Sequence, residues 1–162
     1  MSDQTTDEKF DDLFSAYFQT EIMTGNNQYD CNNCNCKVDA AKTMRLTNSP
    51  TLFALGINRF EYDWTRWRMN KIYKKVTIPL LLDTVRCGVA NDYYILLAVI
   101  FHRGSESVGH YTCVMRTIDD ATQAYNTSQY HAGAWYNCSD AYKAQISYNK
   151  FAKWMNSGGD PT

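Results

Sequence analysis

An amphipathic helix is predicted by the first pattern of apolar and polar positions in the chain, over residues 8–23. Its large apolar side chains recur at steps of three and four, which places them on one helical face: Phe10, Leu13, Phe14, Tyr17, Phe18 and Ile22. Acidic residues stand near its start, where the helix dipole favours negative charge. Gly25 would end the helix.

The pattern changes after Pro50 and favours strands. Short apolar runs, or alternation of apolar and polar positions, predict strands over residues 51–60, 72–78, 93–101, 110–116, 123–126 and 134–137. A Gly- and Ser-rich turn separates the strands at 93–101 and 110–116, so we expect these two to form a hairpin. A short helix is predicted over 151–155. The expected fold class is therefore α+β, with one helix first and mostly antiparallel strands after it.

Composition narrows the class of protein. The 162 residues are 44% hydrophobic, which suits a packed core and argues against a disordered chain. A formal net charge of −1 gives no electrostatic reason to expect a nucleic-acid partner. The longest apolar run, 93–101, is far shorter than the roughly 20 residues that cross a membrane. Without a signal peptide at its polar N-terminus, the chain is expected in the cytoplasm or nucleus, where thiols stay reduced.

His110 is the strongest candidate for chemistry. It stands at the start of a predicted strand, directly after Gly109 and a polar loop. An imidazole titrates near neutral pH, so it can take a proton from a thiol and return it to a leaving amine. Such a base needs an orienting acceptor, which Ser139 or Asp140 could supply. On spacing alone, a structural histidine with ordinary hydrogen bonds is the commoner interpretation.

The chain has six cysteines, and two of them, Cys31 and Cys34, have the spacing of metal ligands. Cys36 lies close by. Two or three thiolates do not complete a tetrahedral zinc site. We therefore expect no cofactor, and zinc at Cys31 and Cys34 stays open as an alternative.

Seven ordered segments, which cover roughly residues 10–147, resemble motifs of the ubiquitin-specific protease (ubiquitin carboxyl-terminal hydrolase) family. They are Leu13 to Glu21 with Tyr29 to Cys34; Lys42; Asn48 to Phe60; Lys71-Ile72 with Thr77-Ile78-Pro79 and Leu82-Asp83; Tyr94 to His102 with Gly104; Gly109-His110-Tyr111-Thr112; and Trp135-Tyr136 with Ser139-Asp140. Seven motifs in the right order rarely coincide, so the resemblance is specific.

The resemblance implies a fold and an activity. The fold would be a papain-like palm, with an antiparallel sheet, finger-like hairpins and an N-terminal helix. The family hydrolyses the isopeptide bond after the C-terminal glycine of ubiquitin with a cysteine–histidine pair. By position, His110 would be the general base and acid, Ser139 would replace the usual Asn or Asp that orients it, and Asp140 would match the acidic residue that follows. Gly109 and Tyr111 would border the channel for the ubiquitin tail.

One family motif has no counterpart in the chain. The box "Gly-x-x-Asn-x-Gly-Asn-Thr-Cys", which carries the nucleophile, does not occur. Cys113 is no substitute, because an odd separation along a strand points it away from His110. We therefore expect residues 1–155 to be the C-terminal part of a ubiquitin-specific protease catalytic domain, an incomplete domain followed by a disordered tail at 156–162.

Three interpretations of function follow. The first is a cysteine-type deubiquitinase region that binds ubiquitin or a ubiquitinated protein and is inactive as an isolated chain. The second is a pseudoprotease fragment that binds ubiquitin without chemistry. The third is a zinc-finger-like interaction module.

Overall fold

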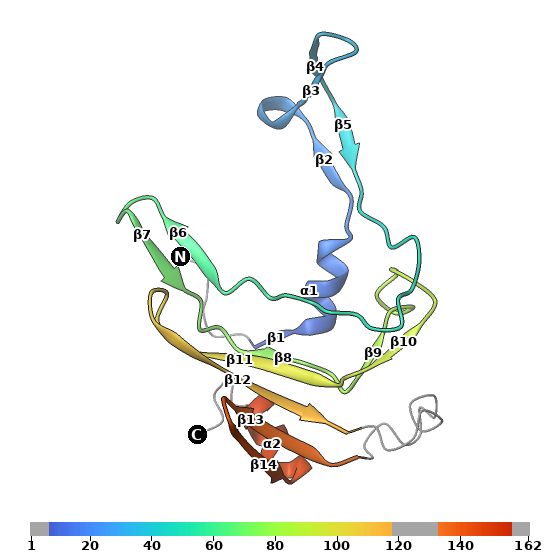
Figure 1. Cartoon of the computed structure of the whole chain (residues 1–162). Helices are drawn as coiled ribbons and strands as arrows, with labels where there is room; N and C mark the ends of the chain where they lie inside the picture. Colours follow the sequence, from blue (N-terminus) through green and yellow to red (C-terminus); the bar gives the residue numbers. More distant parts are fainter. Residues whose placement is uncertain (1–6, 118–132, 157–162) are drawn as a thin grey trace.

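The computed structural model describes residues 7–117 and 133–156 (Figure 1). These residues form short strands, with one α-helix near the start and one at the end. In chain order they are β1 (Glu8–Lys9), α1 (Phe10–Tyr17), β2 (Glu21–Met23), the 3-10 turn η1 (Gly25–Asn27), β3 (Tyr29–Cys31), β4 (Cys36–Val38), β5 (Ala40–Lys42), β6 (Phe60–Asp63), β7 (Arg68–Lys71), β8 (Val76–Thr77), β9 (Leu81–Asp83), β10 (Tyr93–Ile95), β11 (Ala98–Gly104), β12 (Gly109–Arg116), β13 (Trp135–Ser139), β14 (Tyr142–Ile146) and α2 (Tyr148–Asn156).

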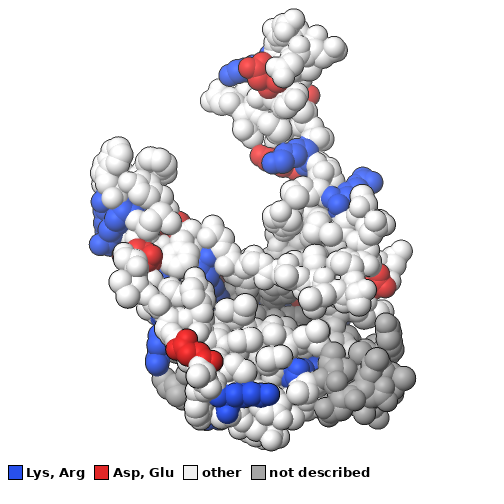
Figure 2. Space-filling model, viewed as in Figure 1, with Lys and Arg blue, Asp and Glu red and all other residues white. Residues whose placement is uncertain are grey.

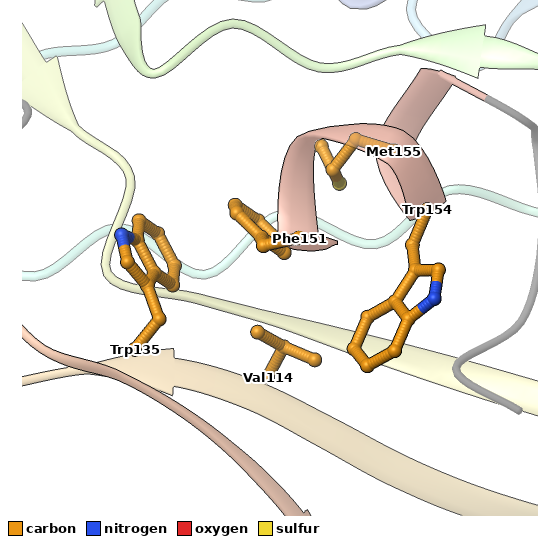
Figure 3. Packing of buried hydrophobic residues seen from close by; sticks show 5 residues of the cluster. All are labelled: Val114, Trp135, Phe151, Trp154 and Met155. Atoms are coloured by element: carbon orange, nitrogen blue, oxygen red, sulfur yellow. The ribbon is translucent and has the colours of Figure 1, made fainter. Parts of the chain in front are cut away.

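The largest sheet has four antiparallel strands in the order β11-β12-β13-β14. Strands that follow one another along the chain are therefore neighbours in this sheet. Helix α2 packs on one face of this sheet and buries Phe151, Trp154 and Met155 against Val114 and Trp135 (Figure 3). The rings of Trp135 and Phe151 stack with their centroids 4.1 Å apart. This cluster is the core that holds β12 and β13 in place.

Two arms extend from the sheet (Figure 1). One arm is built from the two-stranded pairs β2-β5 and β3-β4, which continue from α1. The other is the β6-β7 hairpin. Figure 2 shows the hollow that lies between them. Within the described residues, neither helix is long and apolar enough to cross a membrane.

The predicted fold class is confirmed, because two helices and mostly antiparallel strands make up the described chain. The hairpin expected from 93–101 and 110–116 is formed by β11 and β12, in the register Val99↔Val114. The strand expected at 134–137 is β13, and the helix expected at 151–155 lies inside α2. The strand expected at 123–126, and most of the tail expected at 156–162, lie outside the described residues.

The predicted helix over 8–23 is too long, since α1 ends at Tyr17. Beyond it, residues Glu21–Met23 pair with Ala40–Lys42 as strand β2. Ile22 is 64% exposed, so it does not continue the apolar face of the helix. A β-branched residue fits a strand at least as well as a helix. A long-range strand partner therefore decided the conformation.

Three predicted strands also differ from the structure. Residues 51–59 form no strand among the described residues, and the run becomes regular only at Phe60, where β6 begins. The run 72–78 is reduced to β8, which pairs in parallel with β1. The run 93–101 is split into two strands with different partners. Its first part, β10, pairs with β9, and the Leu96 N–H continues that pairing to the carbonyl of Leu80, whereas β11 begins at Ala98 and pairs with β12. Apolar runs of this length specify burial more firmly than they specify pairing.

Candidate active site

His110 and Ser139 meet at the end of the four-stranded sheet. His110 is the second residue of β12 and Ser139 is the last residue of β13. The His110 Nε2 atom lies 2.8 Å from the Ser139 Oγ atom, a hydrogen-bond distance. Because Nε2 is engaged by the hydroxyl, proton exchange with a nucleophile falls to Nδ1. An imidazole held in this way by a hydroxyl can act as a general base.

Asp140 adds a carboxylate at the same place. Its Oδ2 atom lies 3.7 Å from His110 Nε2, and its side chain is 83% exposed. Asp140 occupies the two-residue turn between β13 and β14 with a φ of 48°. Asp tolerates this left-handed conformation better than most residues do. Solvent screens the carboxylate, so its electrostatic effect on the imidazole is smaller than the distance suggests.

Gly109 is required by its surroundings. A Cβ atom at this position would lie 2.0 Å from the Nε2 atom of His102 and 2.5 Å from the carbonyl oxygen of Arg103. No side chain fits there without movement of the hairpin. Two residues further along β12, Tyr111 is 63% exposed, and its ring centroid lies 4.7 Å from that of His102. Gly109 and Tyr111 thus form an open edge beside His110.

Lys71 ties the β6-β7 arm to this edge. Its Nζ atom lies 3.1 Å from His102 Nδ1 and donates to the carbonyl oxygens of His102, at 2.8 Å, and Gly104, at 2.7 Å. Because Gly104 pairs with Gly109 across the hairpin, Lys71 holds the strand end that precedes His110. Sequence reasoning gave Lys71 and His102 no role in the site. No spacing in the sequence reveals a contact between positions so far apart.

None of the six cysteines, all of which the structure describes, forms a hydrogen bond with His110. Cys113 faces Cys138 across the β12-β13 ladder, whereas His110 reaches Ser139, the next residue along β13. Successive residues of a strand point to opposite faces, so Cys113 lies on the other face of the sheet from His110. Burial raises the pKa of the Cys113 thiol, and the nearby Cys138 raises it further.

Of the metal-ligand candidates, Cys31 ends β3 and Cys34 lies in the turn between β3 and β4. A hydrogen bond from the backbone N–H of Cys34 lowers the pKa of the Cys31 thiol, and the Cys34 side chain lowers it further. In the described part of the chain, however, no group of three or more His, Cys, Asp or Glu side chains could hold a metal ion. The donor set does not fit a complete tetrahedral zinc site.

A pocket of about 1610 Å³ opens on the hollow between the arms, from the side of α1 and the β6-β7 hairpin. Its lining comes from α1, the irregular segment before β6, and the β6-β7 hairpin, and it includes Lys71 and Glu106. Lys71 belongs both to this lining and to the contacts that hold the hairpin before His110. The hollow and the histidine edge are therefore connected through one side chain.

A protein-family comparison matches residues 1–156 to the family described as ubiquitin carboxyl-terminal hydrolase. Among curated relatives, human ubiquitin carboxyl-terminal hydrolase 35 is 36% identical over 106 residues, which are 65% of this chain and 10% of that protein. Ubiquitin carboxyl-terminal hydrolase 5 of Schizosaccharomyces pombe is 28% identical over 156 residues, 93% of this chain and 13% of the relative. The chain thus spans only a small part of the length of these relatives.

Solved structures show the same fold. A chain of the SAGA DUB module bound to monoubiquitin superimposes with a TM-score of 0.69 at 20% identity, over 92% of this chain and 31% of that chain. The module bound to ubiquitin aldehyde gives a TM-score of 0.66 at 20% identity, over 92% of this chain and 32% of that chain. These likenesses establish that the chain has the same fold as the corresponding parts of these solved domains.

Proposed function

Because the chain belongs to the ubiquitin carboxyl-terminal hydrolase family, we propose that it supplies the histidine side of a cysteine-type deubiquitinase region. This region hydrolyses the isopeptide bond after the C-terminal glycine of ubiquitin. The observation that carries the proposal is the 2.8 Å contact between His110 Nε2 and Ser139 Oγ, beside the open edge formed by Gly109 and Tyr111.

The chemistry assigned to each residue follows from this contact. Ser139 accepts the Nε2–H of His110, which leaves Nδ1 unprotonated and able to take the proton of a thiol. The thiolate attacks the carbonyl carbon of the ubiquitin tail, and His110 returns the proton to the departing lysine amine. Ser139 carries no charge to stabilise the imidazolium, so Asp140, at 3.7 Å, provides the negative charge.

Ubiquitin is the proposed occupant of the hollow between the arms. The hollow is open toward the side on which both arms extend, and Figure 2 shows that its rim is accessible. Lys71 and Tyr111 both contact His102, close to the strand end that carries His110. Solved relatives of the same fold are described as bound to monoubiquitin and to ubiquitin aldehyde, which supports this assignment.

A second candidate function is a ubiquitin-binding module that does no chemistry. One observation favours it, namely that none of the six cysteines hydrogen-bonds to His110. Under this alternative the hollow and Tyr111 still contact ubiquitin, and His110 and Ser139 serve as a structural pair.

The first experiment is a titration of the chain into isotope-labelled ubiquitin, followed by NMR. We expect resonances of the ubiquitin tail to shift, and Tyr111→Ala to weaken binding. Tyr142→Ala is the matched control, because both tyrosines are 63% exposed and Tyr142 lies on β14. Absence of binding by the folded wild-type chain would overturn both candidate functions.

The second experiment uses a ubiquitin probe with a thiol-reactive group at its C-terminus and intact-mass detection. A covalent adduct that His110→Ala abolishes would show that a cysteine of this chain is the nucleophile. Binding without an adduct would assign to this chain the ubiquitin-binding role alone. In that case a cysteine-bearing segment of the same protein is added. The proposed role of His110 stands only if this addition produces the adduct and His110→Ala abolishes it.

A further inference from the structure

Cys113 and Cys138 are direct partners in the β12-β13 ladder. Partners in an antiparallel pair project from the same face of the sheet. Both side chains are partly exposed. The structure thus places two thiols side by side on strands that the chain brings together only when it folds.

The ladder geometry sets the distance between them. Four residues along the same ladder, the N–H of Thr117 donates to the carbonyl of Ala134 at 2.9 Å. Hydrogen-bonded pairs recur at every second residue, so Cys113 and Cys138 are also such a pair, with Cα atoms about 5.5 Å apart. Disulfides span Cα separations of about 4.4–6.8 Å. The Cα separation of this pair therefore falls within the range that a disulfide spans.

The pKa of the Cys113 thiol also reflects the presence of Cys138. Burial is the first cause of the raised pKa of Cys113, and the charge of Cys138 is the second. This proximity agrees with the register of the strands.

We propose that Cys113 and Cys138 form an oxidation site, at which a hydroperoxide converts the two thiols into a cross-strand disulfide. In the first step one thiolate attacks the peroxide oxygen, the O–O bond breaks, and a sulfenic acid forms. In the second step the other thiol attacks that sulfur, the S–O bond breaks, and water leaves. Overall, two thiols lose two electrons and two protons, and hydrogen peroxide is reduced to two molecules of water.

The position of the bond gives it a consequence for the candidate site. Cys138 directly precedes Ser139, and Cys113 follows His110 by three residues on β12. A disulfide would fix β13 against β12 on the face of the sheet opposite to the His110–Ser139 contact. A regulatory effect of this kind rests on the proposed function, whereas formation of the disulfide does not depend on it.

A second cysteine pair needs to be distinguished from this one. Cys31 and Cys36 are partners in the β3-β4 hairpin, with Cys34 beside Cys31. These cysteines lie close together in sequence, so their oxidation does not require the folded sheet. The Cys113–Cys138 bond requires the β12-β13 pairing.

The test is peptide mapping of the full chain after treatment with hydrogen peroxide and alkylation of the remaining thiols. Trypsin places Cys113 in the peptide 104–116, Cys138 in 117–143, and the three hairpin cysteines together in 10–37. We expect a linked pair of peptides 104–116 and 117–143, which dithiothreitol separates. Cys113→Ser and Cys138→Ser should each abolish it, and Cys87→Ser should leave it intact.

A variant with Cys31, Cys34, Cys36 and Cys87 changed to Ser keeps only the proposed pair. Its count of free thiols should fall from two to zero with peroxide, and its melting temperature should rise by roughly 5 °C or more. The same treatment in guanidinium chloride should give little linked peptide. Full alkylation of Cys113 and Cys138 after peroxide treatment, or equal linkage in the unfolded chain, would overturn the proposal.

Discussion

Gly109 is a position of the candidate site with no space for a side chain. Its position against His102 Nε2 is set by the β11-β12 register, which Lys71 reinforces from the neighbouring arm. The backbone directly before His110 is therefore closely packed against His102 and Arg103. Positioning of the imidazole therefore depends on a residue that has no functional group.

We expect Gly109→Ala to destabilise the chain by about 1–3 kcal/mol, because the added Cβ would overlap the His102 ring. Urea denaturation gives the free energy of unfolding. Gly56→Ala is the control, since a Cβ at that position meets nothing within 4 Å, and its effect should stay within about 0.5 kcal/mol. Equal stability of the two variants would show that the hairpin yields easily and that Gly109 does not fix it.

The sequence predicted the residues that meet in the candidate site, but it did not predict the residues that hold them in position. His110, Ser139 and Asp140 were identified through motifs in which type and order are both informative, and the structure brings the three together. Their catalytic roles remain proposals. Lys71 and His102 were missed as parts of the site, because a contact between an arm and a strand end arises only from tertiary packing.

At the scale of elements, segments that pack on the core were predicted correctly, and segments that lie away from it were not. The β11-β12 hairpin and α2 have an apolar face that one core buries, so their patterns are strong. Strand β2 and the segment before β6 contribute little to any core, and Ile22 and Leu52 are 64% and 70% exposed. Where burial does not select a conformation, pattern alone cannot distinguish helix, strand and loop.

The β6-β7 hairpin is stabilised at its tip by Asp63. The carboxylate accepts hydrogen bonds from Thr65 Oγ1 at 2.5 Å, from the Thr65 N–H at 2.9 Å, and from the Arg66 N–H at 3.1 Å. The Thr65 hydroxyl is the main reason that the pKa of Asp63 lies below its usual value of 3.8. These bonds order the turn that carries Trp64 and Trp67. Trp67 has a φ of 52°, which is uncommon for a bulky residue.

The lowered pKa of Asp63 predicts how the hairpin tip responds to acid. The ionised carboxylate stabilises the tip at every pH above 3.8, and that contribution is lost as the pH falls through the lower pKa of the folded state. We expect the indole N–H resonances of Trp64 and Trp67 to shift only below pH 3.8. In Asp63→Ala they should already have their low-pH positions at pH 7. A transition above pH 3.8, unchanged in that variant, would contradict this assignment.

At the scale of the whole molecule, the buried residues of the described chain, apart from Phe14, all lie from Val76 onward. Between Phe14 and Val76, a stretch that is fully described, no residue is buried. Both arms lie within this stretch, whereas Val114, Trp135 and Phe151 are 0%, 2% and 1% exposed in the sheet and α2. The arms thus hold their shape through strand pairing and exposed contacts alone, which contribute little to stability.

This asymmetry predicts a division in hydrogen exchange. Amides of β2-β5, β3-β4 and β6-β7 should exchange by local opening, well before those of β12 and β13, which should exchange only with loss of the core. Deuterium uptake followed by mass spectrometry measures both sets in one experiment. Because ubiquitin is the proposed occupant of the hollow, its addition should slow exchange in both arms and leave β13 unchanged. Arms that are already as protected as β12 in the free chain would mean that they belong to the cooperative core, despite having no buried residue.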